Sequence, residues 1–143
     1  MLRGVPAIIP PELLKILAEM GHGDEITIGD ANFPGHSHAK VVVRMDGHGV
    51  PEVLDAILTL MPLDHLYPHP AMLMQVAPGD NVETPIWETY KEILAKHEAR
   101  GAACLEEVER QAFYDRVKEK SCAVIMTGEK ALYANVILKK GVL

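Results

Sequence analysis

His22 is the candidate proton-transfer group of this sequence, because it stands between Gly21 and Gly23 in a turn that joins an expected helix to an expected strand. An unperturbed imidazole titrates at about pH 6.5, so it gives and takes protons near neutral pH. The two flanking glycines leave the ring unshielded and let a ligand come close to the backbone. The alternative interpretation is a helix C-terminus that happens to carry a histidine facing solvent.

Asp30 is the candidate ligand-binding acid. It directly follows an expected strand at residues 26–28, and Asn32, Phe33 and Pro34 place an amide, an aromatic ring and a rigid bend beside it. A carboxylate that accepts two hydroxyl hydrogen bonds next to an apolar face is a common way of holding a sugar or polyol. We expect the strand and its turns to bring this carboxylate to the same edge as His22. A turn-forming aspartate that caps its own backbone accounts for the spacing equally well.

Two further pairs offer donors and acceptors for sugar hydroxyls. Tyr133 and Asn135 are two residues apart at the start of an expected strand, so both side chains would point the same way. Arg110 and Tyr114 are four apart and share one face if their segment is helical. The alternatives are an ordinary hairpin edge for the first pair and, for Arg110, a solvated charge cluster with the acidic residues at 106–109.

The histidine-rich loop at His36-Ser37-His38 suggests a competing chemistry. Alternate histidines on a strand project to one side and can share a metal ion. A metal site needs a third ligand from elsewhere, however, and the preceding Pro34-Gly35 indicates a loop. A His-x-His metalloenzyme is therefore the less favoured alternative, and we expect no metal. His65 and His69 are expected in exposed loops.

The elements that must position these residues alternate in type. Helices are expected at residues 11–20, 51–58, 85–94 and 112–120, and strands at 26–28, 41–43, 72–76, 122–126 and 133–138. This alternation predicts an α/β fold: a single three-layer domain over residues 1–143, with a central β-sheet and helices on both faces. Ligands of such sheets usually sit in the loops outside the strand ends.

Composition narrows the classes of partner. The 143 residues carry 14 Lys and Arg against 20 Asp and Glu, a net charge of −6, which excludes a polyanion binder held by bulk charge. Cys104 and Cys122 are far apart in the sequence, which indicates a reducing compartment. No apolar stretch approaches a membrane span. We therefore expect a cytoplasmic protein with a small uncharged partner, and neither a nucleic acid nor a membrane.

Together these residues resemble the L-fucose mutarotase and D-ribose pyranase family, from about Gly4 to Val142. The matching pieces occur in the family's order and at its distances. They are Pro11-Glu12-Leu13-Leu14, Gly21-His22-Gly23-Asp24-Glu25, Asp30 with Asn32-Phe33-Pro34, Arg44-Met45-Asp46-Gly47, Phe113-Tyr114, Thr127-Gly128-Glu129, Tyr133-Ala134-Asn135 and Lys139-Lys140-Gly141-Val142. The stretches Glu109 to Tyr114 and Pro85-Ile86-Trp87 look like the fucose branch. Ala134 departs from the family, where glycine is usual.

The resemblance implies a cofactor-independent isomerase that interconverts the α and β anomers of L-fucose or a related sugar. In the family the histidine matching His22 is the proton donor, and the tyrosine matching Tyr114 is also implicated in catalysis. Contacts to the sugar are implied for the residues matching Asp30, Asp64, Met74, Arg110, Tyr133 and Asn135. The resemblance also implies a ring of subunits, commonly a decamer of two pentamers, in which a neighbouring chain completes the site.

Anomer exchange opens the hemiacetal ring, turns the aldehyde and closes the ring again. Opening requires that a proton reach the ring oxygen while another leaves the anomeric hydroxyl. We expect His22 to supply the first proton, and Tyr114 or a water held by Asp30 to take the second. A non-catalytic sugar-binding or sensing module with the same pocket is the alternative from a different functional class.

Overall fold

Six strands form one mixed sheet in the structure, a computed structural model that describes residues 1–143. The strands are β1 (Glu25–Gly29), β2 (Val42–Met45), β3 (Ala71–Met74), β4 (Leu105–Val108), β5 (Ser121–Thr127) and β6 (Val136–Lys139). Their order is β2-β5-β1-β6-β3-β4, and only β6 is antiparallel to its neighbours. The carboxyl ends of five strands therefore share one edge of the sheet with the amino end of β6.

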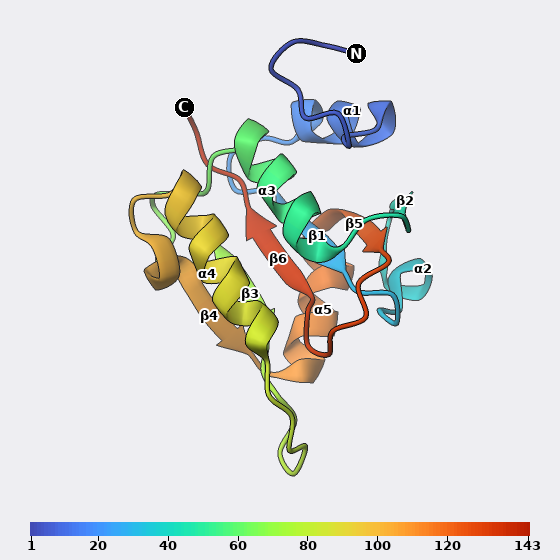
Figure 1. Cartoon of the computed structure of the whole chain (residues 1–143), viewed down its shortest axis with the longest axis vertical. Helices are drawn as coiled ribbons and strands as arrows, with labels where there is room; N and C mark the ends of the chain where they lie inside the picture. The colour runs from blue at the N-terminus through green and yellow to red at the C-terminus, as the bar shows by residue number, and fades with distance from the viewer.

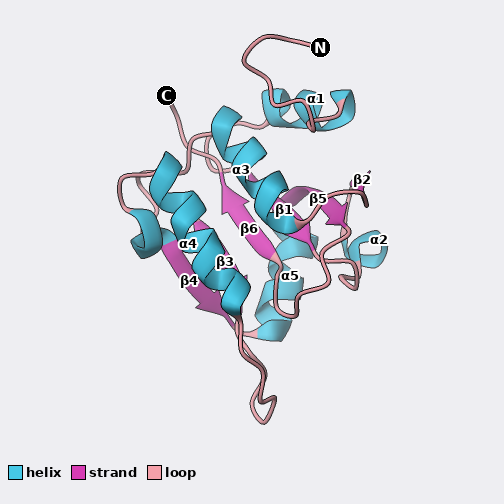
Figure 2. Ribbon diagram, in the orientation of Figure 1, coloured by secondary structure: helices cyan, strands magenta, loops and turns pink.

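Helices cover both faces of this sheet, as Figures 1 and 2 show. They are α1 (Pro11–Glu19), α2 (Gly35–His38), α3 (Val50–Leu60), α4 (Pro85–His97) and α5 (Arg110–Lys120), with a 3₁₀ turn, η1 (Gly101–Cys104), before β4. Helices α1, α3 and α4 pack on one face, and α5 and the single turn of α2 pack on the other. The predicted three-layer α/β architecture is confirmed. No helix combines the length and the apolarity needed to cross a bilayer.

The core is divided by the sheet because successive strand residues point to opposite faces. In β5, Ala123 and Ile125 join the core beneath α1, α3 and α4, whereas Val124 and Met126 join the core beneath α5. All four side chains are at most 3% exposed. The near-continuous apolar run at 122–126 is thus a strand covered on both sides, as predicted.

Two sequence predictions need correction, and one further segment forms an element that the sequence pattern does not indicate. The strand expected at 133–138 begins only at Val136, because Tyr133 has a φ of 53° and stands in a turn. The segment 105–108, where no periodicity is evident, is strand β4, whose two glutamates suit the open edge of the sheet. Residues 35–38, expected as a loop, form one helical turn.

Candidate functional site

A cavity of about 220 Å³ opens at the edge where the carboxyl ends of the parallel strands meet the amino end of β6. It is smaller than the roughly 300–1,000 Å³ pockets that hold drug-sized ligands, so it suits a small ligand. Six of the eight predicted site residues line it. The lining residues are Asp30, Asn32, Phe33, Met74, Asp80, Arg110, Tyr114, Leu132, Tyr133 and Asn135.

Asp30 and Asn135 form the polar base of the cavity, and each fixes the other. The backbone N–H of Asp30 donates to Asn135 Oδ1 at 2.8 Å, and the backbone N–H of Asn32 donates to Asp30 Oδ1 at 2.9 Å. The Asn135 side chain also hydrogen-bonds to the Asp30 carboxyl, so both polar groups are held in place where they line the cavity, the carboxylate as an acceptor and the amide as a donor. The pair therefore presents one acceptor and one donor in fixed positions, an arrangement that matches a hydroxyl-bearing ligand.

Burial raises the pKa of the Asp30 carboxyl above its usual value, although hydrogen bonds from the Asn32 and Phe33 backbone and from Asn135 act in the opposite direction. The side chain of this residue is held in the protein interior, and the residue as a whole is only 7% exposed. Water therefore solvates its charge poorly, and a sugar hydroxyl that donates to Oδ2 would supply part of the missing solvation.

Helix α4 holds the backbone of the segment that carries Tyr133 and Asn135. The Trp87 indole N–H donates to the Tyr133 carbonyl at 2.8 Å, and the fully buried Tyr90 hydroxyl donates to the Ala134 carbonyl at 2.7 Å. Tyr133 is the only non-glycine residue with a positive φ. Left-handed backbone is rare for such a residue, so these two hydrogen bonds stabilise a conformation that the local sequence does not favour.

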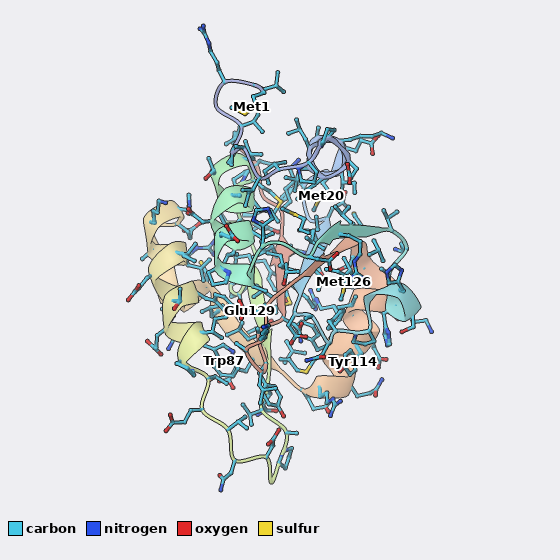
Figure 3. The ribbon with its side chains drawn as sticks, turned by 45° about the vertical axis from the view of Figure 1, so that its right-hand side comes forward. Met1, Met20, Trp87, Tyr114, Met126 and Glu129 are labelled. Atoms are coloured by element: carbon cyan, nitrogen blue, oxygen red, sulfur yellow. The ribbon has the colours of Figure 1, made fainter.

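The predicted pair Arg110 and Tyr114 shares one face of α5, as its spacing indicated. The Arg110 guanidinium carbon lies 5.7 Å from the centroid of the Tyr114 ring. That ring is in turn 5.8 Å from the ring of Phe33, which packs edge-on to Phe113 at 6.3 Å. An aromatic layer thus continues from the core into the cavity wall, and Figure 3 shows Tyr114 and Trp87 at the same lower end of the molecule. Arg110 belongs to the cavity lining rather than only to a surface charge cluster.

Two lining residues escaped the sequence analysis, Asp80 and Leu132. Asp80 lies on the segment 75–84, which hangs from the end of β3 in Figure 1 before α4 begins. In sequence, Pro78-Gly79-Asp80 reads only as a turn that ends a strand, although an acid in a loop after a strand end was a usable signal. Leu132 is 55% exposed and forms an apolar edge of the cavity. Nothing in its sequence context distinguished it.

His22 and Asp64, the other two predicted site residues, form a separate pair. His22 Nε2 lies 3.0 Å from Asp64 Oδ1, and the backbone N–H of Leu66 donates to the same oxygen at 2.9 Å. The His22 side chain is 39% exposed and that of Asp64 only 6%. Burial alone would raise the pKa of Asp64, but the hydrogen bonds from His22 and Leu66 hold it below its usual value. Asp64 therefore fixes the orientation of an accessible imidazole.

The expectation that His22 and Asp30 reach the same edge of the sheet is wrong within one chain. His22 precedes β1 and Asp30 follows it, and the five residues from Glu25 to Gly29 run straight through the sheet. At about 3.3 Å per residue, the Cα atoms at the two ends of this strand are roughly 13 Å apart. The cavity consequently contains the polar groups expected to bind a ligand but lacks the imidazole expected to transfer a proton.

The remaining histidines do not form a metal-binding cluster. His36 Nε2 lies 3.2 Å from an Arg44 nitrogen, whereas His38 Nδ1 lies 2.9 Å from the Ser37 hydroxyl and its ring packs against Tyr114. His65 stacks on His22 with ring centroids 6.4 Å apart, and His69 contacts the Ala103 carbonyl. No group of three or more His, Cys, Asp or Glu side chains has the geometry to hold a metal ion.

The fold and the cavity define an α/β protein that holds a carboxylate and an amide in fixed positions at the strand ends of a mixed sheet. The sequence pattern of the RbsD / FucU transport protein family matches residues 3–143. This chain therefore belongs to the RbsD / FucU transport protein family.

Individual relatives match over nearly the whole chain. The fucose mutarotase of Homo sapiens is 48% identical, over 99% of this chain and 94% of that protein. The crystal structure of FucU from Bifidobacterium longum superposes with a TM-score of 0.96 at 54% identity and covers 99% of both chains. The fucose mutarotase of Streptococcus pneumoniae, solved in complex with L-fucose, gives a TM-score of 0.93 at 45% identity, again over 99% of both chains.

Proposed function

We propose that this protein is an L-fucose mutarotase, an isomerase that interconverts the α and β anomers of the free sugar. The observation that carries the proposal is the cavity, in which Asp30 and Asn135 offer a fixed acceptor and a fixed donor above an aromatic wall. The full-length likeness to proteins named fucose mutarotase, one of them solved with L-fucose, supports the choice of reaction and sugar.

The predicted site residues that line the cavity have distinct parts in holding the sugar. Asp30 accepts from a ring hydroxyl, and the Asn135 amide and the Arg110 guanidinium donate to sugar oxygens. Tyr133 provides a further polar contact, whereas Met74, which is 3% exposed, and the aromatic wall pack on the apolar face of the sugar. Hydrogen-bond donors and acceptors, some neutral and some charged, thus surround an uncharged sugar.

His22 supplies the proton for ring opening. Its Nε2 is held by Asp64, so the accessible imidazole has a fixed orientation at the protein surface. A water held by Asp30, passing its own proton to the carboxylate, or Tyr114, passing its phenolic proton to water, takes the proton from the anomeric hydroxyl as the ring C–O bond breaks. Closure returns both protons, so neither a covalent intermediate nor a net change of the enzyme is needed. Placed acid–base groups contribute about 10²–10⁴-fold, which is sufficient because mutarotation already proceeds in water.

The position of His22 calls for a second copy of the chain. The His22–Asp64 pair lies at one end of β1 and the cavity at the other, so one subunit's imidazole would reach the cavity of another through two different surface patches. Repeated head-to-tail, such heterologous contacts give a ring where the rotation closes. Leu66, 72% exposed beside Asp64, and Leu132 at the cavity provide apolar surface for this contact. We place the protein in a ring of subunits, a decamer of two pentamers, as the family resemblance implies.

The two cysteines fit a reducing compartment. Cys104 and Cys122 are both free thiols, and burial raises the pKa of each. We place the protein in the cytoplasm on this basis.

Saturation-transfer NMR between the anomer resonances of L-fucose tests the proposal. We expect the protein to accelerate exchange of L-fucose more than that of D-ribose, and His22→Ala to slow it about 10²–10⁴-fold while the sugar still binds. Binding of L-fucose without any faster exchange would replace the isomerase with a sugar-sensing module. Static light scattering of the same sample reports whether the ring is present.

A further inference from the structure

Asp80 makes one side-chain hydrogen bond within the chain, and it is to a residue of the cavity. The Tyr133 hydroxyl donates to Asp80 Oδ2 at 2.5 Å, and the same hydroxyl oxygen accepts from the backbone N–H of Ala77 at 3.2 Å. Asp80 and Ala77 both belong to the segment 75–84, and the Asp80 backbone N–H closes a turn onto the Ala77 carbonyl. Two points of this one segment therefore hold the tyrosine hydroxyl.

The hydrogen-bonding capacity of that hydroxyl is almost fully used. A phenol has one proton to donate and two lone pairs that can accept. The proton is directed to a charged carboxylate, which makes the stronger kind of hydrogen bond. Ala77 occupies one lone pair, so a single lone pair remains for a ligand in the cavity. Tyr133 can then accept a hydrogen bond from a sugar hydroxyl but has no proton to offer.

We propose that Asp80 is a positioning residue that makes Tyr133 an obligate acceptor, and so selects sugars that carry a donating hydroxyl at the point facing Tyr133. This inference rests on the proposed function, since it concerns the same cavity. It assigns selectivity to a lining residue that acts through the direction of the Tyr133 O–H bond. Glu83 is another exposed carboxylate of the same segment and makes no hydrogen bond to Tyr133, so it serves as a matched control.

Asp80→Asn reverses the constraint with little change of shape. Its amide N–H can donate to the tyrosine oxygen, and the tyrosine proton is then free to turn toward the ligand. The variant should therefore tolerate a sugar in which the facing hydroxyl has been replaced by a group that accepts but cannot donate. Asp80→Glu keeps a carboxylate and should keep the selectivity of the wild type.

The experiment measures dissociation constants for analogues of L-fucose in which one ring hydroxyl at a time is replaced by fluorine, with the methyl glycosides testing the anomeric position. We expect the wild type to bind one analogue at least about tenfold more weakly than L-fucose, the size of one lost hydrogen bond to a polar site. The penalty of an analogue is the ratio of its dissociation constant to that of L-fucose. For that analogue the penalty should fall at least about fivefold in Asp80→Asn. The penalty should be unchanged in Asp80→Glu and in Glu83→Gln.

A Tyr133→Phe background decides whether Asp80 acts through the tyrosine. There, Asp80→Asn should leave every penalty unchanged. An equal penalty in the wild type and Asp80→Asn at all positions would overturn the inference, as would a fivefold effect that persists in Tyr133→Phe. These binding measurements are independent of anomer exchange, so a wild type that binds L-fucose without exchanging its anomers would contradict the proposed function and leave the role of Asp80 testable.

Discussion

His22 and Asp30 lie beyond opposite ends of strand β1, eight positions apart in sequence and on different edges of the sheet. Asp30 faces the cavity with Asn135, whereas His22 is paired with Asp64 beside the end of β6. A reaction that uses both residues thus requires that the cavity of one subunit meet the His22 edge of another. Whether His22 and Asp30 act in one reaction therefore depends on how the subunits assemble.

Mixing two inactive variants tests this shared site. His22→Ala retains an intact cavity, and Asp30→Asn retains an intact His22–Asp64 pair. When the two are unfolded, mixed in equal amounts and refolded, random head-to-tail pairing should give about one quarter of the sites both intact parts. Saturation transfer with L-fucose measures the recovered exchange. Recovery no greater than the sum of the separately refolded variants would place the whole reaction within one chain.

Asp64→Asn separates orientation of His22 from binding of the sugar. The asparagine cannot supply the charge that holds the imidazole through Nε2, so we expect the exchange rate at saturating L-fucose to fall at least about tenfold, within the range that a placed acid contributes. The half-saturating concentration should change little. Measurement of exchange over a series of sugar concentrations gives both values. A raised half-saturating concentration with an unchanged maximal rate would instead assign Asp64 to direct sugar contact.

Asp64 should also contribute to stability in a pH-dependent way. Its pKa is lowered in the folded protein by His22 and the Leu66 N–H, so its contribution is present above the unfolded pKa of about 3.9 and is lost as the pH falls through the lower folded value. Urea unfolding of the wild type and Asp64→Asn should give a less stable variant at neutral pH. The two free energies of unfolding should converge only below the lowered folded pKa of Asp64, well under its ordinary value.

Asp30→Asn should show the opposite dependence. Burial raises the pKa of Asp30, so the folded protein is penalised once the carboxyl ionises, and the wild type loses stability as the pH rises through that raised value. We expect the variant to be more stable than the wild type at neutral pH, with the difference vanishing in acid. The same substitution should abolish detectable L-fucose binding. A variant less stable at neutral pH would show that Asp30 is stabilised by its hydrogen bonds rather than strained by burial.

Tyr90→Phe tests the support of the cavity from α4. The substitution deletes the hydroxyl that donates to the Ala134 carbonyl and leaves that buried acceptor without its partner, so the free energy of unfolding should fall by about 1–3 kcal/mol. L-fucose affinity should fall with it, because Ala134 lies between two cavity residues. Thr59→Ala, which removes an exposed hydroxyl on α3, should change stability by less than about 0.5 kcal/mol. Unchanged affinity in Tyr90→Phe would limit its role to the core.

Spacing alone left each pair of cavity residues with an ordinary structural alternative, and the family resemblance selected the binding interpretation. Asp30 directly follows β1 and Asn135 directly precedes β6, and the two meet at one end of the sheet because β6 runs antiparallel to β1. Arg110 and Tyr114 share a face for a local reason, the helical repeat. The apolar run of β5 likewise predicted a strand covered on both faces.

Residues placed by long-range geometry were not predictable in the same way. The pairing of His22 with Asp64 joins positions 42 apart and depends on how two loops meet beside β6. Asp80 reaches the cavity only because the segment 75–84 bends back to Tyr133, 53 positions further on. Tyr133 and Asn135 both line the cavity although the strand expected to align them begins three residues later than predicted, at Val136, since a left-handed turn does the aligning instead.

That left-handed turn has a kinetic consequence. The unfavourable backbone conformation of Tyr133 is adopted when the protein folds and is maintained by Trp87 and Tyr90, so no ligand has to induce it. A binding site already in its bound shape loses little entropy on association and captures its ligand at a rate set by encounter. Rapid capture and release suit a catalyst of a reaction that water already performs unaided, for which any slow rearrangement would cancel the advantage.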